Sequence, residues 1–206
     1  MKNNKQPVMR LVNGISAYLE YQFQCGKGKL FSEKYLAEPI GNILQSAFDY
    51  QVFAEYNHPY IKNISNKGRP IQIDFVGLDE NDKIVVALET KWFGKRELDN
   101  EEWLWDCYRL ALISAENPDS LCLLIASGIN NIEMTSKLIR LQGEKYKNIK
   151  INSRDIRGKI IKDKLVNYNI NIDIKSIMVF PPHLAQSGKS GNSWKTYSWL
   201  IQSSKK

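Results

Sequence analysis

Asp74, Glu89 and Lys91 are the side chains whose types and spacing best suit chemistry at a metal ion. Glu89 and Lys91 are two residues apart in an apolar segment, so on a β-strand both project from one face and Thr90 projects from the other. If Asn81-Asp82 is a two-residue turn, the register of the resulting hairpin places Asp74 opposite Glu89. Two facing carboxylates destabilise a hairpin unless a cation separates them. A divalent ion such as Mg²⁺, which prefers oxygen ligands, would remove the conflict.

A metal held by Asp74 and Glu89 would polarise a phosphate and help to make a hydroxide nucleophile. Lys91 would orient or deprotonate the attacking water, or stabilise the charge that develops in the transition state. The alternative is a solvated strand pair in which Glu89 and Lys91 are ordinary surface residues. The apolar sequence around Glu89 argues against that alternative, because such a strand belongs inside a protein.

The segments around these residues predict alternating helices and strands. The 206 residues, of which 43% are hydrophobic, favour one domain over residues 1–206 with a core at about 30–127. Ser32 is a good N-cap for the second helix, and Pro39 predicts a kink in it or a later start. The expected elements are helices at 8–24 and 32–47, strands at 51–56, 71–78 and 83–91, a helix at 99–115 and a strand at 121–126.

The C-terminal extension, about residues 130–206, is less regular. A helix is expected at 130–142, a strand at 174–180 and a last aromatic strand at 194–200 that adds an edge to the sheet. Residues 137–164 contain ten Lys and Arg against three Asp and Glu. This local excess of seven positive charges equals the net charge of +7 of the whole chain. This segment either follows a nucleic-acid backbone or forms a solvated face.

Asp74, fourteen further residues and then Glu89-Thr90-Lys91 resemble the core of the PD-(D/E)xK nuclease superfamily. The resemblance covers about residues 30–127, and the α-β-β-β-α-β order agrees with it. It implies an α/β restriction-endonuclease-like fold, with a mixed central sheet flanked by helices. The family's proline before the aspartate is replaced by Ile73, and Pro70 lies four residues before Asp74.

The resemblance also implies a function, namely metal-dependent hydrolysis of nucleic-acid phosphodiesters with Mg²⁺ or Mn²⁺. DNA is the commonest substrate among similar proteins, and a double-strand cutter often needs a homodimer. Asp74 and Glu89 would be the metal ligands and Lys91 the third catalytic residue. The alternatives are a catalytically inactive nuclease-fold module that binds nucleic acid or a protein partner, and an interaction protein with a coincidental motif. The intact acidic pair and lysine argue against the inactive module, because a binding module has no need of them.

Flanking helices carry further candidates. Similar nucleases often add an acid on the helix before the sheet, and Glu33 and Glu38 both qualify. Glu33 falls within the apolar, sheet-facing side of its helix and Glu38 falls away from it, which favours Glu33 as an additional catalytic acid. An acid in a first helical turn also favours the helix dipole without any catalytic role. Asp106 and Arg109 either support the site or form an ordinary i,i+3 ion pair.

Four residues near the strands are candidates for contact with nucleic acid. Gln72 shares the face of Asp74 if its strand is regular, although an ordinary polar sheet residue would look the same. Arg69 precedes that strand and either meets a phosphate or is solvated. Lys95 and Arg96 follow the strand that carries Lys91.

Composition narrows the setting. The pI of about 9.2 favours polyanion partners. Cys25, Cys107 and Cys122 are odd in number and lack metal-ligand spacing, which indicates a reduced intracellular protein, with the last two in the core. His58 and His183 lie next to prolines in expected loops and do not suggest a zinc site. With no apolar run long enough for a bilayer and no signal-peptide pattern, we expect a cytoplasmic protein without a membrane partner.

Overall fold

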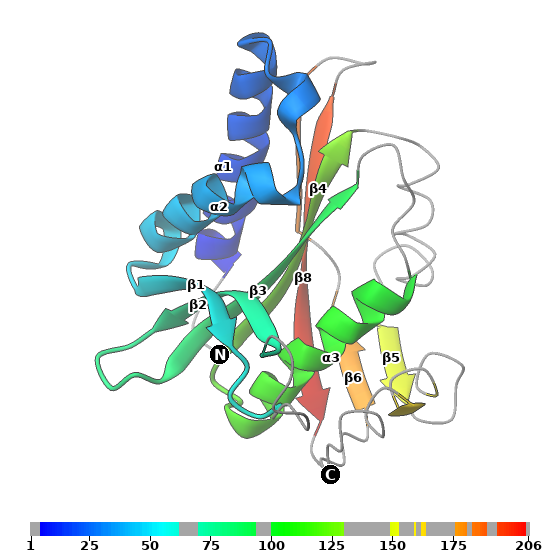
Figure 1. Cartoon of the computed structure of the whole chain (residues 1–206). Coiled ribbons are helices and arrows are strands. Elements are labelled where there is room, and N and C mark those ends of the chain that lie inside the picture. The colour runs from blue at the N-terminus through cyan, green and yellow to red at the C-terminus, as the bar shows by residue number, and fades with distance from the viewer. Residues whose placement is uncertain are drawn as a thin grey trace.

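The fold is a mixed β-sheet with helices on both faces (Figure 1). The computed structural model describes residues 5–61, 70–93, 100–129, 149–152, 159, 162–163, 176–180, 183–188 and 193–204. Its elements are α1 (Lys5–Gln24), η1 (Gly28–Leu30), α2 (Glu33–Phe48), β1 (Gln51–Asn57), β2 (Gln72–Leu78), β3 (Ile84–Phe93), α3 (Asn100–Glu116), β4 (Leu121–Ile129), β5 (Ile149–Asn152), β6 (Ser176–Val179), β7 (His183–Ser187) and β8 (Trp194–Ser204).

Within the described residues the strand order is β1-β2-β3-β4-β8-β6-β5, and β7 pairs with β8. The β3–β4 pair is parallel and the other pairs are antiparallel. The predicted α/β class with a mixed sheet is confirmed, and the elements from α2 to β4 follow the predicted order. The helix expected at 130–142 and most of the basic segment lie outside the described residues.

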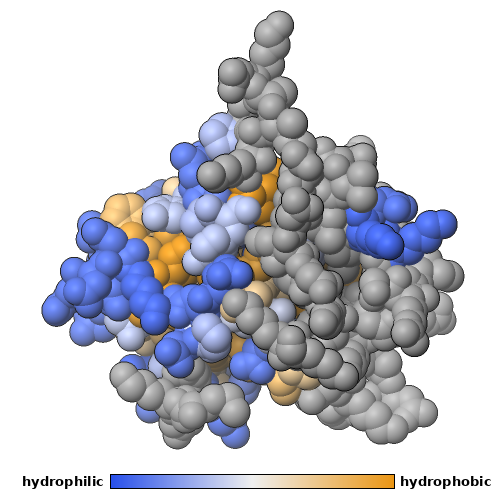
Figure 2. Space-filling view, turned by 90° about the horizontal axis from the view of Figure 1, so that it is seen from below, coloured by the Kyte–Doolittle hydropathy of each residue, from blue (hydrophilic) through white to orange (hydrophobic). Residues whose placement is uncertain are grey.

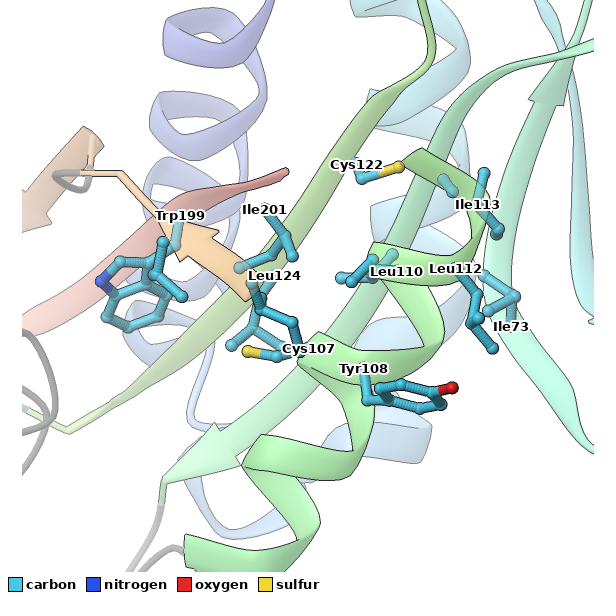
Figure 3. Packing of buried hydrophobic residues seen from close by; sticks show 14 of the residues in the cluster. Ile73, Cys107, Tyr108, Leu110, Leu112, Ile113, Cys122, Leu124, Trp199 and Ile201 are labelled. Atoms are coloured by element: carbon cyan, nitrogen blue, oxygen red, sulfur yellow. The ribbon is translucent and has the colours of Figure 1, made fainter. Parts of the chain in front are cut away.

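Two apolar layers enclose the sheet. One layer lies between the sheet and helices α1 and α2. The other lies on the opposite face, between the sheet and α3 (Figure 3). Cys107 and Cys122 are free thiols buried in the α3 layer, as predicted. From below, the described surface is mainly hydrophilic with apolar patches between (Figure 2). The described helices include none long and apolar enough to span a membrane.

The α2 helix begins as predicted, because the Ser32 hydroxyl accepts a hydrogen bond from the Tyr35 backbone N–H at 3.2 Å. Pro39 lies inside the helix without delaying its start. The helix therefore presents Glu33 in its first turn, directly beside the sheet.

The predicted edge position of the last strand is wrong, because β8 lies inside the sheet between β4 and β6. The strand buries apolar side chains on both faces: Trp199 and Ile201 pack in the α3 layer, while Trp194 packs in the α1–α2 layer. Such a strand buries more apolar surface with neighbours on both sides. His183, expected in a loop, belongs to β7, whose pairing with β8 holds it in extended conformation.

The turn between β2 and β3 is longer than the predicted two residues. Asp82 has a φ of 58°, and the backbone N–H of Asp79 donates to the carbonyl of Lys83. The Asp79 carboxylate accepts from the backbone N–H groups of Asn81 and Lys83, both at 2.9 Å. This side chain stabilises the turn in place of the expected two-residue geometry.

The predicted hairpin register nevertheless holds. A register shift between Gly77 and Leu78 inserts one extra residue in β3. The shift offsets the longer turn, so Phe75 pairs with Leu88, as a two-residue turn would require. The bulge therefore brings the two predicted acids to adjacent positions on neighbouring strands.

Candidate functional site

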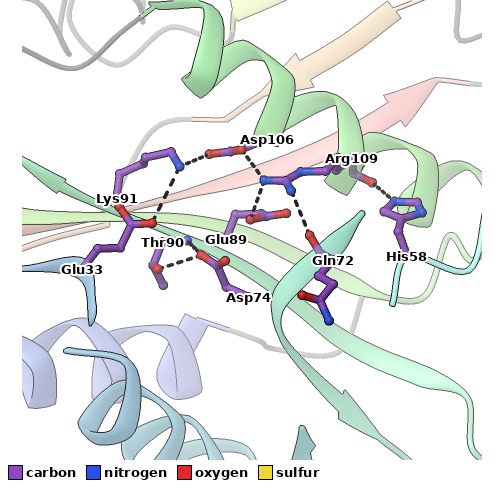
Figure 4. A network of polar contacts seen from close by, with 9 residues as sticks. All are labelled: Glu33, His58, Gln72, Asp74, Glu89, Thr90, Lys91, Asp106 and Arg109. Carbon is purple, nitrogen blue, oxygen red and sulfur yellow. Dashed lines mark hydrogen bonds and ion pairs between the residues drawn. The ribbon is translucent and has the colours of Figure 1, made fainter. Parts of the chain in front are cut away.

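The candidate site lies where β2 and β3 separate, just beyond the Phe75–Leu88 pair (Figure 4). We call this point the fork. Thr90 donates both its backbone N–H and its hydroxyl to Oδ2 of Asp74, each at 2.7 Å. The carboxylate takes the hydrogen bond that a backbone carbonyl would accept in a continuing ladder. Sequence reasoning missed this contact, because strict alternation placed the Thr90 side chain on the face opposite Glu89.

Glu89 is completely buried at the same fork. Its Oε2 accepts a hydrogen bond from Arg109 at 2.9 Å, whereas its Oε1 has no hydrogen-bond partner among the described residues. Burial raises the pKa of the Glu89 carboxyl well above its ordinary value, Asp106 raises it further, and Arg109 opposes the shift. The protein thus holds a carboxylate in a place where its charge is costly.

Lys91 lies near Glu89 and contacts acids on the helices at both faces of the sheet. Its Nζ is 2.8 Å from Oδ2 of Asp106 and 4.0 Å from Oε1 of Glu33. Burial lowers the pKa of Lys91, but attraction to Asp106, Glu33 and Glu89 outweighs it, so the pKa is raised overall. The lysine therefore remains an ammonium group. Of the two roles predicted for Lys91, such a group can stabilise negative charge but cannot accept a proton from water.

The structure brings Glu33, and not Glu38, to these residues. The Glu33 side chain is 47% exposed and borders Lys91. Burial raises the pKa of Glu33, Lys91 opposes the shift, and Asp74 adds to it. Glu38 instead lies near Tyr18 on α1, where burial, Tyr35 and Glu38 together raise the Tyr18 pKa to about 12.

Helix α3 ties the two strands together through Arg109. Its guanidinium contacts both Glu89 and Asp106, and donates to the backbone carbonyl of Gln72 at 2.8 Å. Asp106 is 2% exposed, so this i,i+3 pair is buried within the site rather than lying on a helix surface. The local spacing predicted the pair, but only the packing of α3 against the fork shows what it faces.

Of the four predicted nucleic-acid contacts, the structure describes only Gln72. The Gln72 side chain donates to the Glu55 carbonyl at 2.6 Å and to Asn57 Oδ1 at 3.3 Å, so it binds β1 as a polar sheet residue would. The other three candidates, Arg69, Lys95 and Arg96, lie outside the described residues.

Six ionisable side chains meet at the fork: Glu33, Asp74, Glu89, Lys91, Asp106 and Arg109. Four are acids and two are bases, so the group carries two excess negative charges when all six are ionised. Burial makes such an excess costly, and a bound dication would balance it. Over the described ranges, no three or more His, Cys, Asp or Glu residues are already spaced as a metal cluster.

His58 fixes the far end of this network. Its Nδ1 accepts from the backbone N–H groups of Tyr60 and Ile61, each at 3.2 Å, which leaves the proton on Nε2, 3.0 Å from the Arg109 carbonyl. Burial lowers the pKa of His58 to about 4, with Arg109 affecting it in both directions through its carbonyl and its charge. The neutral ring therefore anchors α3 beside the fork.

Acid is accordingly expected to destabilise the fold through His58. Between pH 6.5 and about 4 the unfolded chain binds a proton that the folded chain refuses, so the free energy of unfolding falls by about 3 kcal/mol as pH drops. His58→Asn keeps a δ-position acceptor but does not titrate, so its stability should fall less over that window. Urea unfolding at about pH 7 and about pH 4.5 measures the difference. Equal losses in the two proteins would contradict the assignment.

Comparison with known proteins adds nothing to this geometry: no family model, curated protein or solved structure matches the chain. The resemblance to PD-(D/E)xK nucleases therefore stays a prediction from the sequence.

Proposed function

We propose that this protein is a metal-dependent nuclease with a restriction-endonuclease-like fold, and that Asp74 and Glu89 bind Mg²⁺ or Mn²⁺. The observation that carries the proposal is that, in each of the two carboxylates, one oxygen is bound by the protein and the other is not. Asp74 commits Oδ2 to Thr90, and Glu89 commits Oε2 to Arg109. Within the part of the chain that the structure describes, no residue donates a hydrogen bond to the buried Oε1 of Glu89 or to Oδ1 of Asp74. Each acid thus keeps one oxygen for a cation.

The residues of the fork would have different roles in hydrolysis. A bound divalent ion would supply Lewis acidity toward a phosphate and lower the pKa of a water molecule. Lys91, held by Asp106, presents a fixed positive charge to the negative charge that develops on the phosphate during hydrolysis. Glu33 is the most exposed of the acids and faces Lys91, so it is placed to orient a water molecule beside that lysine.

The substrate follows from charge and analogy. A net charge of +7 favours a polyanion, and DNA is our first choice because it is the commonest substrate of similar nucleases. A cytoplasmic location and a homodimer that cuts both strands belong to the same proposal.

The competing proposal is an inactive nuclease-fold module that binds nucleic acid or a protein partner. It is favoured by the ion pairs themselves, since Lys91–Asp106 and Glu89–Arg109 resemble a structural network. It does not account for the excess of acids at the fork or for the Oε1 atom of Glu89, which no described residue binds.

A cleavage assay tests the proposal. Plasmid, single-stranded DNA and RNA are incubated with the protein and Mn²⁺, Mg²⁺ or EDTA. Asp74→Asn removes a ligand charge with little change in shape, and Lys91→Met removes the ammonium but keeps an unbranched stem. Each should lower the rate at least about 100-fold, because each deletes several kcal/mol of charge stabilisation. Absence of metal-dependent cleavage on all substrates would refute the nuclease proposal, and undiminished rates in both variants would refute the site.

A further inference from the structure

We propose that Thr90 is a positioning residue that fixes the Asp74 carboxylate so that Oδ1 faces the metal. The inference rests on the proposed function and extends it to a residue that the acid–acid–lysine pattern does not specify. Both donors of Thr90, the backbone N–H and the hydroxyl, meet the same oxygen of Asp74 at 2.7 Å (Figure 4).

Two donors on one oxygen restrict a carboxylate more than one donor does. A single N–H leaves the carboxylate free to turn about its terminal torsion, which has a broad energy profile. The hydroxyl approaches Oδ2 from the side chain and the N–H from the backbone, so turning the carboxylate weakens both bonds. The other oxygen, Oδ1, is thereby held in one direction.

The fork makes this support necessary. Backbone pairing between β2 and β3 ends at Phe75 and Leu88, so Asp74 is held by the β1 ladder on one side of its strand but by no ladder on the β3 side. Thr90 is only 6% exposed, and a buried hydroxyl needs a partner. A β-branched residue in a buried strand would by itself explain Thr90 as a packing residue. Valine would pack equally well there, however, and would give Asp74 no second donor.

The expected magnitude follows from other metal sites. Removing a group that orients a metal ligand typically lowers metal affinity or activity about 10–100-fold. Thr90→Val deletes the hydroxyl and keeps the branched shape and the backbone N–H. Thr90→Ser keeps the hydroxyl and loses only the methyl group.

The experiment is a calorimetric Mn²⁺ titration of the full chain without nucleic acid, followed by cleavage kinetics. We expect Thr90→Val to bind Mn²⁺ about 10–100-fold more weakly than wild type and Thr90→Ser to bind within about threefold of it. In the cleavage assay, kcat of Thr90→Val should fall at limiting Mn²⁺ and recover partly at saturating Mn²⁺. KM for the nucleic acid should not change, because both donors of Thr90 are engaged by Asp74 and the residue is only 6% exposed.

Thr196→Val is the matched control. Thr196 is fully buried in β8, and its hydroxyl accepts a hydrogen bond from Ser127 at 3.1 Å. The same atoms are deleted there, two strands away from β3, so Mn²⁺ affinity should match that of the wild type. A loss in both valine variants would indicate a general packing effect and overturn the inference.

The outcomes separate the two proposals. If the wild type binds Mn²⁺ and cleaves, and Thr90→Val binds Mn²⁺ equally well, the role of Thr90 is overturned but the proposed function stands. A wild type that neither binds Mn²⁺ nor cleaves overturns the proposed function and this inference together. Thr90→Ala is measured in parallel, so that the hydroxyl is tested even if the valine variant does not fold. Wild-type Mn²⁺ affinity in a folded alanine variant also overturns the inference.

Discussion

Glu89→Gln is expected to abolish metal-dependent cleavage while leaving the metal-free protein at least as stable as the wild type. The two effects have opposite physical origins. As a ligand, the carboxylate supplies charge that the neutral amide lacks, so cleavage at saturating Mn²⁺ should fall at least about 100-fold. As a buried acid, Glu89 is a cost to the metal-free fold, because burial and Asp106 raise its pKa.

The stability half of this prediction follows from the charge balance at the fork. Glutamine keeps the shape of Glu89 and a carbonyl oxygen that accepts from Arg109. It removes the repulsion with Asp74 and Asp106, both of which disfavour the ionised form of Glu89. Arg109 retains its contact with Asp106, so its charge is not left unpaired. The substitution therefore exchanges an excess negative charge for a neutral group in the same space.

Urea unfolding in EDTA measures the stability and the plasmid assay measures the rate. Glu38→Gln, the same change on the outer side of α2, is the control and should alter neither. A loss of about 3 kcal/mol or more for Glu89→Gln would mean that the Glu89–Arg109 pair holds the fold together. That result would favour the inactive nuclease-fold module over the nuclease.

The strands and their register could be predicted from the sequence because both depend on local patterns. Apolar segments marked β2 and β3, and the short connection between them limited the register to a few values. The register came out correctly for an incomplete reason: the longer turn that Asp82 forms and the bulge beside Gly77 offset each other. Alternation also predicted the common face of Glu89 and Lys91.

The rest of the site depends on contacts between distant segments. Helix periodicity placed Asp106 and Arg109 on one side of α3, but not the depth at which they meet Glu89 and Lys91. Strict alternation placed Thr90 on the face opposite Glu89, which agrees with Leu88 and Trp92 in the α1–α2 layer, but it gave no reason to expect the contact of Thr90 with Asp74. The place of β8 inside the sheet likewise depends on pairing with β4 and β6, which no local spacing encodes.

Arg109→Met is expected to destabilise the metal-free protein by about 3–5 kcal/mol, the usual cost of leaving buried charges without their partner. Arg109 is bound to Glu89, Asp106 and the Gln72 carbonyl, and so compensates two acids and one backbone acceptor at once. Methionine fills much of the same volume but supplies no donor. Urea unfolding in EDTA measures the loss, and a loss below about 1 kcal/mol would show that the guanidinium is not what holds α3 to the fork.

The second half of the Arg109 prediction distinguishes charge from packing. In Arg109→Met the excess of negative charge at the fork grows from two to three, so adding Glu89→Gln should recover part of the lost stability. Mn²⁺ should stabilise Arg109→Met more than wild type, because the cation then balances a larger excess, and should stabilise the double variant least. If Mn²⁺ raised the stability of all three proteins equally, the cation would be binding elsewhere. The same cycle thus locates the metal at the fork without any measurement of cleavage.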